Sequence, residues 1–167
     1  PITIKNSKIA MELMNKSIMV TGGAGSIGSE IVRQICNYSY KSLIVLDSAE
    51  SALYDLQQEL KQNGFHNFIP IVTDIRDKNR MNALFNEHRP NVVFHAAAYK
   101  HVPLMEEGNA WQAILNNVLG THVLAQAAVK HGVERFILIS TDKAVNPTNV
   151  MGASKRMAEM VCQAQQQ

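Results

Sequence analysis

Cysteine is scarce in this chain of 167 residues, and the two present, Cys36 and Cys162, lie far apart in predicted helices. They form no C-x-x-C spacing, so we interpret them as free thiols of a reducing compartment rather than as a disulfide or a zinc site. Of the six histidines, His95 and His101 are closest in sequence, and no nearby cysteine or carboxylate completes a ligand set. The sequence therefore predicts no bound metal.

Strong net charge and long apolar runs are also missing. The formal net charge is +2 and no basic patch is interleaved with aromatic residues, which argues against binding to nucleic acid or directly to a membrane surface. No apolar run approaches the roughly 20 residues that span a bilayer, and no signal peptide is visible. Apolar residues make up 46% and charged residues 18%, which predicts one globular domain with a sizeable core.

Short β-branched apolar runs alternate with longer helical patterns along the chain. The runs are nearly continuous in apolar residues, as in parallel strands covered on both faces, and lie at 17–21, 42–47, 68–72, 91–96 and 135–140. Helices are predicted at 27–38, 50–63, 77–88 and 109–131, and a last one from near Met151. This alternation predicts an α/β fold, a Rossmann-like doubly wound parallel sheet with right-handed crossovers. Residues 1–16 are expected to form a lead-in helix and residues 17–167 the sheet domain.

The stretch VTGGAGSIGSE follows the first predicted strand and opens a helix. Gly22, Gly25 and Gly28 repeat in the spacing G-x-x-G-x-x-G. In a dinucleotide-binding turn these glycines permit the tight turn, the close approach to a pyrophosphate and the packing of helix on sheet. The helix N-terminus, with Ser26 and Ile27, offers unpaired N–H groups and a positive dipole end to the anion. A purely structural turn is the alternative, but the flanking strand and helix and an acidic residue about 20 positions on favour a dinucleotide site.

That acidic residue is Asp47, which ends the second predicted strand and is placed for the diol of an adenine ribose. A carboxylate there repels a ribose 2′-phosphate, so NAD is favoured over NADP, although Arg76 or Lys78 would still be able to reach that phosphate. Asp74, with Ile75 beside it, is a candidate to bind the adenine, its carboxylate accepting from the amino group. A turn aspartate or helix N-cap is the alternative for Asp74.

Four motifs together carry a family resemblance: TGGAGSIGSE, HAAAYKHVPLME, NNVLGT and STDKAVNPTNVMGASKR. With them the chain resembles the extended short-chain dehydrogenase/reductase superfamily, and within it the bacterial nucleotide-sugar 4,6-dehydratases of polysaccharide biosynthesis. It is most similar to the large branch that acts on UDP-N-acetylglucosamine-type substrates and has methionine in place of the tyrosine of Tyr-x-x-x-Lys. The resemblance extends from Ile18 to Met160.

The resemblance implies an NAD(P)-binding half followed by a smaller substrate-binding half. The chain would then be the cofactor-binding fragment of a longer enzyme, truncated before the C-terminal substrate-binding part. It also implies a UDP-sugar as partner and a homo-oligomeric parent. Because the soluble domain of this branch follows a membrane-spanning region, we expect a cytoplasmic domain of a protein anchored in the inner membrane. The fragment alone is expected to bind cofactor without turnover.

The reaction implied by the resemblance is redox-neutral: NAD⁺ takes hydride from carbon 4 of the hexose, water leaves across carbons 5 and 6, and the hydride returns to carbon 6. By position, Thr141 would hydrogen-bond the sugar near the 4-hydroxyl, Asp142 would protonate the departing 6-hydroxyl and Lys143 would be the base at carbon 5. Many relatives have glutamate at the last position. Lys143 must therefore be neutral to act, which positive charge from Lys155 or the oxidised nicotinamide would favour. An ordinary loop ion pair of Asp142 with Lys143 is the alternative.

Met151 and Lys155 occupy the tyrosine and lysine positions of the motif. Lys155 is expected to bind the hydroxyls of the nicotinamide ribose, with a helix-surface lysine as the alternative. Met151 has no acidic proton, so it marks the branch, and a space-filling core residue is its alternative. The 4-hydroxyl proton would have to leave through Asp142, Lys143, Lys155, a ribose hydroxyl or ordered water.

The motif HAAAYKHVP follows the fourth predicted strand. Small side chains at Ala96, Ala97 and Ala98 leave room for the cofactor. Tyr99 and Lys100 would face the nicotinamide or the sugar, a surface loop being the alternative.

Asn117 matches a family asparagine that braces the central helix and the cofactor site, whereas Glu106 lies in a stretch that departs from the family spacing, which puts a substrate role in doubt. The sequence thus favours dehydration of a UDP-N-acetylhexosamine for a capsule, lipopolysaccharide or glycan. A nucleotide-sugar epimerase or reductase is one alternative, and Thr-Asp-Lys argues against it because simple epimerases eliminate no water. A non-catalytic dinucleotide-binding sensor is another, and Met151 is its best support.

Overall fold

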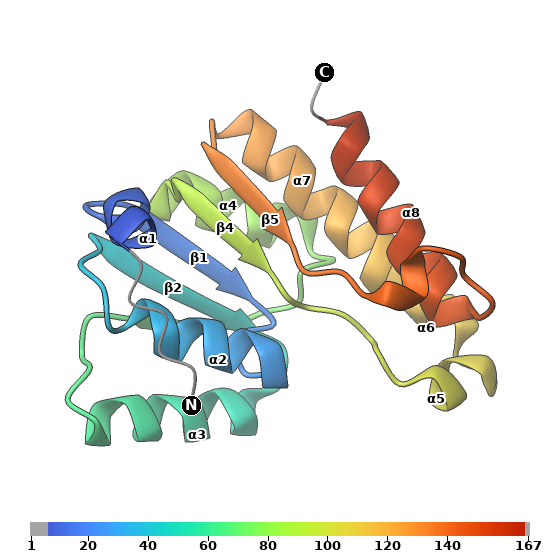
Figure 1. Ribbon diagram of the computed structural model, residues 1–167, viewed down its shortest axis with the longest axis horizontal. Coiled ribbons are helices and arrows are strands. Elements are labelled where there is room, and N and C mark those ends of the chain that lie inside the picture. The colour runs from blue at the N-terminus through green and yellow to red at the C-terminus, as the bar shows by residue number, and fades with distance from the viewer. Residues whose placement is uncertain (1–6, 166–167) are drawn as a thin grey trace.

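Five parallel strands form the centre of the computed structural model, which describes residues 7–165. They are hydrogen-bonded in the order β3-β2-β1-β4-β5 (Figure 1), with bounds β1 Ser17–Thr21, β2 Ser42–Asp47, β3 Ile69–Val72, β4 Val92–His95 and β5 Arg135–Leu138. The predicted α/β fold with a doubly wound parallel sheet is therefore confirmed. Three strands are one to two residues shorter at an end than the apolar runs suggested.

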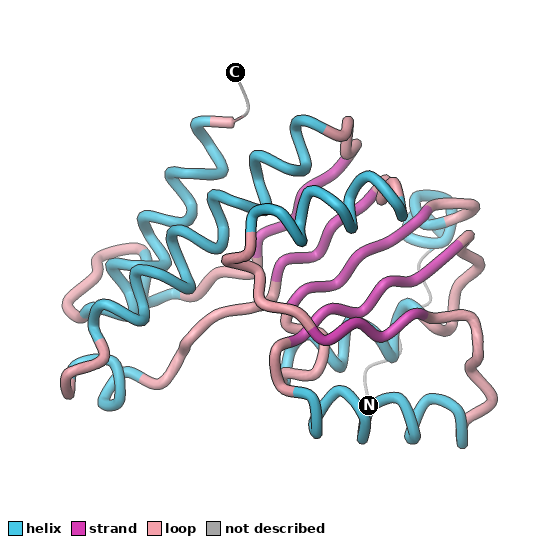
Figure 2. Tube along the Cα trace, turned by 180° about the vertical axis from the view of Figure 1, so that it is seen from behind, coloured by secondary structure: helices cyan, strands magenta, loops and turns pink. Residues whose placement is uncertain are grey.

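Helices cover both faces of the sheet. One face carries α2 (Ser26–Ile35) and α3 (Glu50–Gln62), and the other carries α4 (Lys78–His88) and α7 (Thr121–Lys130), as Figures 1 and 2 show. α8 (Val150–Ala164) packs beside α7. Alternate residues of β1 serve the two layers, since Ile18 and Val20 join the core under α2 while Met19 joins the core under α4 and α7. This two-sided burial explains why the strands read as continuous apolar runs.

Several helical regions differ from the sequence-based expectation, among them α5 (Val102–Glu106), where no helix was predicted. The predicted helix 109–131 is divided into α6 (Ala110–Ala113), the π-helix η1 (Ile114–Gly120) and α7. The widened hydrogen-bond ring of a π-helix leaves no trace in apolar periodicity, so the pattern could not predict it. The lead-in helix predicted at 1–16 is observed as α1 (Ser7–Leu13), and residues 1–6 of that prediction lie outside the described residues.

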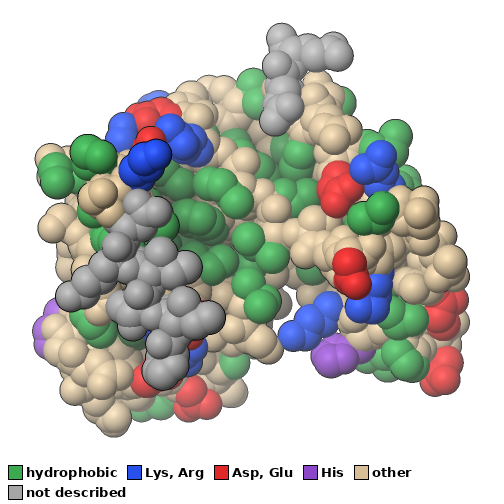
Figure 3. Space-filling view, viewed as in Figure 1, with side chains coloured by type: hydrophobic (Ala, Val, Ile, Leu, Met, Phe, Trp, Pro, Cys, Tyr) green, Lys and Arg blue, Asp and Glu red, His purple; other side chains and the backbone are tan. Residues whose placement is uncertain are grey.

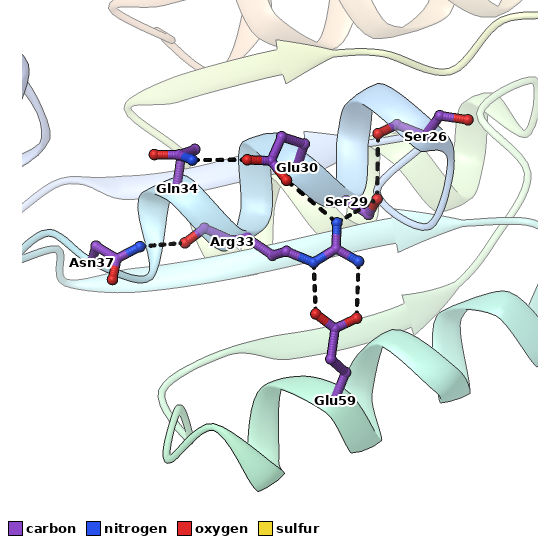
Figure 4. Close-up of polar contacts among 7 residues, drawn as sticks. All are labelled: Ser26, Ser29, Glu30, Arg33, Gln34, Asn37 and Glu59. Atoms are coloured by element: carbon purple, nitrogen blue, oxygen red, sulfur yellow. Dashed lines mark hydrogen bonds and ion pairs between the residues drawn. The ribbon is translucent and has the colours of Figure 1, made fainter. Parts of the chain in front are cut away.

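A bidentate ion pair fixes α2 against α3. Arg33 donates from Nε and Nη2 to the two carboxylate oxygens of Glu59, at 2.6 and 2.8 Å (Figure 4). Arg33 also donates to Ser29 Oγ at 3.1 Å, one turn from the start of α2. Because α2 begins directly after the glycine stretch, this pair helps to hold the N-terminus of α2 in place.

The sheet face under α2 and α3 continues beyond them onto β4 and β5, where no described helix crosses it (Figure 1). Phe94 and Ile137 on these strands are only partly buried. Figure 3 shows hydrophobic side chains gathered there, next to a groove of about 500 Å³ whose apolar lining is Ile9, Leu13, Ile31, Ile35, Tyr38 and Phe94. No helix between residues 7 and 165 has both the length and the apolar character needed to cross a bilayer.

Candidate functional site

The candidate site lies at the carboxyl ends of β1 and β4. These strands are neighbours in space, with Thr21 opposite His95, but β2 and β3 extend the sheet in one direction and β5 in the other. The crevice at such a reversal of strand order is where open α/β sheets bind ligands. The glycine stretch leaves β1 here and the alanine stretch leaves β4, so the fold brings two predicted cofactor segments together.

Gly22 and Gly28 allow these segments to pass closely. Gly22 has φ +67°, and a Cβ on it would lie 2.4 Å from the backbone nitrogen of Ala97. A Cβ on Gly28 would lie 2.0 Å from the carbonyl oxygen of Gly22. Gly25 precedes α2 as its N-cap, in an extended conformation and without a side chain over the helix end. The loop is therefore an open backbone cradle at a helix N-terminus, as a pyrophosphate requires.

Asp47 is bound to this cradle. Its Oδ2 accepts from Ala24 N and its Oδ1 from Ala49 N, both at 2.9 Å. The carboxylate thus connects the end of β2 to the glycine loop. It also lines a pocket of about 100 Å³ on the β2–β3 side, with Gly22, Ser48, Thr73, Asp74, Ile75, Arg76, Ala97, Tyr99 and Asn116. Four residues predicted for cofactor binding beyond the loop itself, including Asp47, therefore share one pocket.

Asp74 holds Arg76 in that pocket. Arg76 Nε lies 3.0 Å from Oδ1 and 2.9 Å from Oδ2 of Asp74, and the Arg76 backbone N–H donates to Oδ1 at 2.9 Å. The hydrogen bonds from Arg76 hold the pKa of Asp74 below its usual range. The N-cap of α4 is Asp77, which accepts from Arg80 N at 2.9 Å. Asp74 is thus a turn aspartate rather than a helix cap, and its contact with adenine stays a prediction.

A second pocket, of about 260 Å³, lies on the β4–β5 side of the glycine loop. Nine residues of its lining had been predicted for the cofactor or substrate site: Ile27, Ala96, Ala98, Tyr99, Lys100, Thr141, Lys143, Met151 and Lys155. Ile139 and Ser140 complete the lining and had not been predicted. Tyr99 borders both pockets, so the two pockets meet at this residue, directly after the three alanines.

Lys155 is a buried cation in this second pocket. It is 5% exposed, and its Nζ donates to the backbone oxygen of Ile139 at 2.6 Å. Burial lowers its pKa, and the nearby Cys162 and Glu159 only partly oppose that shift. A lysine on the helix surface would be solvated, so that alternative is wrong. The side chain instead lines the larger pocket, and its contact with a nicotinamide ribose stays a prediction.

Met151 fills space and lines the pocket at once. It is 3% exposed and packs with Met105 and Ala113 in a small apolar cluster, yet it forms part of the pocket wall. Met151 is therefore a core residue that also borders the pocket, and its role in the site stays a prediction. Glu106 helps to hold this corner, because its Oε1 accepts from Val150 N at 2.6 Å at the start of α8.

Thr141, Asp142 and Lys143 follow β5 in a short 3-10 turn, η2 (Asp142–Ala144). The Thr141 hydroxyl donates to Asp142 Oδ1 at 2.9 Å, and Lys143 Nζ lies 3.6 Å from the same oxygen. The Thr141 hydrogen bond and then the Lys143 charge lower the pKa of Asp142, whose side chain is 88% exposed. The loop ion pair named as the alternative is therefore present. Thr141 and Lys143 line the pocket, whereas Asp142 lies at its solvent side and not in the lining.

Asn117 supports the site from beneath. It is fully buried on η1, and its Nδ2 donates to Tyr99 O at 3.0 Å and to Ser154 Oγ at 2.9 Å. Its Oδ1 accepts from Tyr99 N at 2.8 Å. These contacts join η1, α8 and the loop after β4, which agrees with the bracing role that the resemblance implied. The adjacent Asn116 borders the smaller pocket and had not been predicted.

Lys100 and His95 make further polar contacts at the site. Lys100 Nζ lies 3.1 Å from Ser26 Oγ, so it reaches over the N-terminus of α2. His95 is fully buried between Thr21 and Thr121, with Nδ1 2.7 Å from Thr21 Oγ1 and Nε2 2.9 Å from Thr121 Oγ1.

The hydroxyls set the tautomer of His95. Thr121 donates its own proton to Asn117 O at 2.6 Å, so it accepts from His95 Nε2–H, and Thr21 donates to Nδ1. His95 was considered only as a metal ligand from the sequence, since nothing there indicates this network. Within residues 7–165, no group of three or more His, Cys, Asp or Glu side chains is arranged to hold a metal.

Comparison with known proteins identifies the family. The family described as "Polysaccharide biosynthesis protein" matches residues 18–167. The chain belongs to this family. It is 48% identical over 166 residues to the capsular polysaccharide biosynthesis protein CapD of Staphylococcus aureus, covering 98% of this chain and 28% of that protein. The UDP-N-acetylglucosamine 4,6-dehydratase (inverting) of Campylobacter jejuni (strain 81-176) is 35% identical over 141 residues, covering 84% of this chain and 40% of that one.

Solved structures of nucleotide-sugar enzymes share the fold. The dTDP-glucose 4,6-dehydratase DesIV of Streptomyces venezuelae, with NAD and TYD bound, matches with a TM-score of 0.77 at 29% identity, covering 88% of this chain and 50% of that chain. UDP-glucose 4-epimerases of Rickettsia species are among the curated relatives of this family member as well. The chain thus spans between about a quarter and about half the length of the proteins that it matches.

Proposed function

We propose that this chain is the NAD-binding part of a nucleotide-sugar 4,6-dehydratase that acts on a UDP-N-acetylhexosamine in polysaccharide biosynthesis. The observation that carries the proposal is the pocket in which Thr141, Lys143, Met151 and Lys155 meet beside the glycine cradle. The relatives named as capsular biosynthesis protein and UDP-N-acetylglucosamine 4,6-dehydratase support the pathway and the substrate class.

The residues present fit a dinucleotide. The smaller pocket presents Asp47 to the adenosine side, the glycine cradle lies between, and the larger pocket presents Lys155 to the nicotinamide side. A Cβ on Gly22 or Gly28 would collide with backbone at the centre of this path, so the glycines keep it open. NAD, when bound, supplies a hydride acceptor that later returns the hydride to the sugar. Lys155 would bind ribose hydroxyls, and Lys100, above the N-terminus of α2, would bind the sugar nucleotide.

The Thr141–Asp142–Lys143 turn would perform the proton transfers. Asp142 is held in its ionised form by the hydrogen bond from Thr141 and the charge of Lys143, so it must take up a proton before it can give one. The 4-hydroxyl proton is suited to this purpose: Asp142 would accept it during oxidation and donate it to the departing 6-hydroxyl. Lys143, once neutral, would take the carbon-5 proton and would return it to carbon 5 when the hydride is added to carbon 6. Met151 would shape the wall and transfer no proton.

The epimerase alternative rests on the Rickettsia relatives named above. Epimerisation needs hydride transfer at carbon 4 but no acid and base for loss of water, so it leaves Asp142 and Lys143 without a task. A dinucleotide-binding sensor would need neither turn residue. Neither alternative includes loss of water. If either is correct, replacing Asp142 or Lys143 should leave the function of the protein unchanged.

The substrate half is proposed to lie outside this chain. The share of each relative that is matched supports this, and so does the apolar face of β4 and β5, where Phe94 and Ile137 stay partly exposed to solvent. We propose a cytoplasmic location with a membrane anchor elsewhere in the parent protein, and a homo-oligomeric parent.

The experiment uses the whole parent protein, incubated with UDP-N-acetylglucosamine and NAD⁺ and followed by NMR. A 4-keto-6-deoxy sugar is the expected product. Lys143→Ala should abolish elimination and leave NAD affinity unchanged, and Arg156→Ala, an exposed neighbour on α8, is the control that keeps activity. An epimerised sugar with an intact 6-hydroxyl would overturn the dehydratase assignment. Cofactor binding without any turnover would favour the sensor.

A further inference from the structure

The smaller pocket holds three charged groups whose arrangement bears on the choice between NAD and NADP. Asp47 and Asp74 contribute carboxylates and Arg76 contributes a guanidinium. Because the pocket has a volume of only about 100 Å³, one bound ribose would lie close to all three. Ser48, next to Asp47, lines it too. A 2′-phosphate on that ribose would therefore meet both an anion and a cation on the pocket wall.

The cation is paired with a carboxylate in the observed arrangement. Arg76 Nε contacts both oxygens of Asp74, at 3.0 and 2.9 Å, and Nη2 contacts Oδ2 as well. The backbone N–H of Arg76 donates to the same carboxylate, so both the backbone and the side chain of Arg76 bind Asp74. Two partly exposed side chains, at 34% and 40%, thus cancel each other's charge at the pocket wall. The single negative charge of Asp47 is what the pocket presents to a ligand.

We propose that Asp74 is a specificity-determining residue, which by binding Arg76 withholds a cation from the ribose 2′-phosphate and reinforces the preference for NAD set by Asp47. This inference rests on the dinucleotide binding in the proposed function. Arginine forms strong bidentate contacts with phosphate, so a released Arg76 would offset the repulsion from Asp47. The pocket therefore contains a cation suited to an NADP site, whose charge is offset by the carboxylate of its neighbour.

The measurement is the ratio of the dissociation constants for NADP and NAD, determined by isothermal titration calorimetry on the protein. Any contact of Asp74 with the adenine is the same in both cofactors and cancels in this ratio. Asp74→Asn keeps the side-chain size and an oxygen for the Arg76 backbone N–H but removes the charge. The ratio should fall about tenfold, equivalent to about 1.4 kcal/mol. Asp74→Asn with Arg76→Gln should restore the wild-type ratio.

Asp77→Asn is the matched control. Asp77 lies three residues further along the same loop, is exposed and caps α4 through Arg80 N, but it does not line the pocket. Asparagine caps helices as well as aspartate does, so this variant should fold and keep the wild-type ratio. Circular dichroism of each variant checks the fold.

The outcomes separate this inference from the proposed function. If the wild type binds NAD and Asp74→Asn leaves the ratio unchanged, the inference is overturned while dinucleotide binding stands. It is also overturned if the double variant keeps the lowered ratio, because Arg76 would then not be the cause, or if Asp77→Asn lowers it equally. If the wild type binds neither cofactor, the dinucleotide assignment itself is overturned, and the inference with it.

Discussion

The side-chain amide of Asn117 lies 2.9 Å from Ser154 Oγ, across 37 residues of sequence. Both groups are fully buried, and Ser154 in turn donates to Met151 O at 2.7 Å. Asn117 also holds the backbone of Tyr99 through its N–H and its carbonyl. The π-helix therefore sets the position of two walls of the larger pocket, the one from α8 and the one from the loop after β4.

Replacing Asn117 by leucine should be strongly destabilising. Leucine has a similar volume but leaves the Tyr99 N–H and the Tyr99 carbonyl without their partner, and it removes the donor to Ser154 Oγ, which keeps its bond to Met151 O. Each buried polar group that loses its partner costs about 1–3 kcal/mol. We expect urea unfolding to show a loss of about 3 kcal/mol or more in the free energy of unfolding. Asn86→Leu, on the exposed side of α4, is the control and should change it by less than about 0.5 kcal/mol. Equal effects of the two variants would show that the amide network does not brace the site.

Gly22 and Gly64 permit a test of the cradle, because both have positive φ, +67° and +83°, but only Gly22 is crowded. A Cβ on Gly22 would meet Ala97 N at 2.4 Å, whereas a Cβ on Gly64 would meet nothing within 4 Å. Each alanine variant has a backbone cost of about 1 kcal/mol. We expect Gly22→Ala to raise the dissociation constant for NAD by at least about tenfold in fluorescence titration, and Gly64→Ala to leave it unchanged. Unchanged affinity in Gly22→Ala would exclude the loop after β1 from the cofactor path.

The sheet and the glycine cradle could be predicted because their signals are local. The strand at 42–47 is apolar from Leu43 to Leu46, and the predicted bounds of the first two strands agree with β1 and β2. The grouping of Thr141, Lys143, Met151 and Lys155 followed from the resemblance, and the pocket brings them together.

The remaining features depend on pairings that sequence spacing does not determine. Nothing in TDIRD tells whether Arg76 turns toward Asp74 or toward a ligand, since both are within reach of a flexible side chain. The burial of Lys155 and its bond to Ile139 O arise from packing between α8 and the end of β5. The exposure of Asp142 likewise depends on how η2 projects from the sheet.

His95 predicts a pH dependence of stability. Burial, and to a smaller degree the charge of Lys155, lowers the pKa of His95 from 6.5 to about 3. Between these values the unfolded chain binds a proton that the folded chain does not, so the stabilising contribution is complete above pH 6.5 and is lost as the pH falls toward 3.

The measurement is urea unfolding at pH 7, 6, 5 and 4.5, with His95→Gln as the comparison. Below pH 6.5 the wild type should lose up to about 1.4 kcal/mol per pH unit from this group, and the variant should lack that part of the slope. Burial lowers the pKa of His131 in the same direction, so the comparison between variants, rather than the wild-type slope, isolates His95. Parallel slopes for the two proteins would mean that His95 titrates normally in the fold.

Lys155 combines a cost to stability with a role in binding. Its amine is buried and donates to Ile139 O, and within residues 7–165 it forms no ion pair with a carboxylate. Replacing a poorly solvated cation by an apolar side chain of similar shape is often neutral or stabilising. Lys155→Met should therefore keep the free energy of unfolding at pH 7 within about 1 kcal/mol of the wild type, or raise it. NAD affinity should fall by about tenfold, because the ribose hydroxyls lose their donor.

Arg156→Met is the matched control for Lys155→Met. Arg156 is adjacent on α8 but exposed, and it pairs with Glu159 at 2.9 Å. Losing that surface pair should lower the free energy of unfolding by no more than about 1 kcal/mol and leave NAD affinity unchanged. Calorimetry with NAD and thermal unfolding of both variants provide the two readouts. The opposite outcome would be a Lys155→Met protein whose free energy of unfolding is lower by more than about 1 kcal/mol and whose NAD affinity is unchanged. Lys155 would then be a structural residue, because its burial would serve the packing of α8 and not the cofactor.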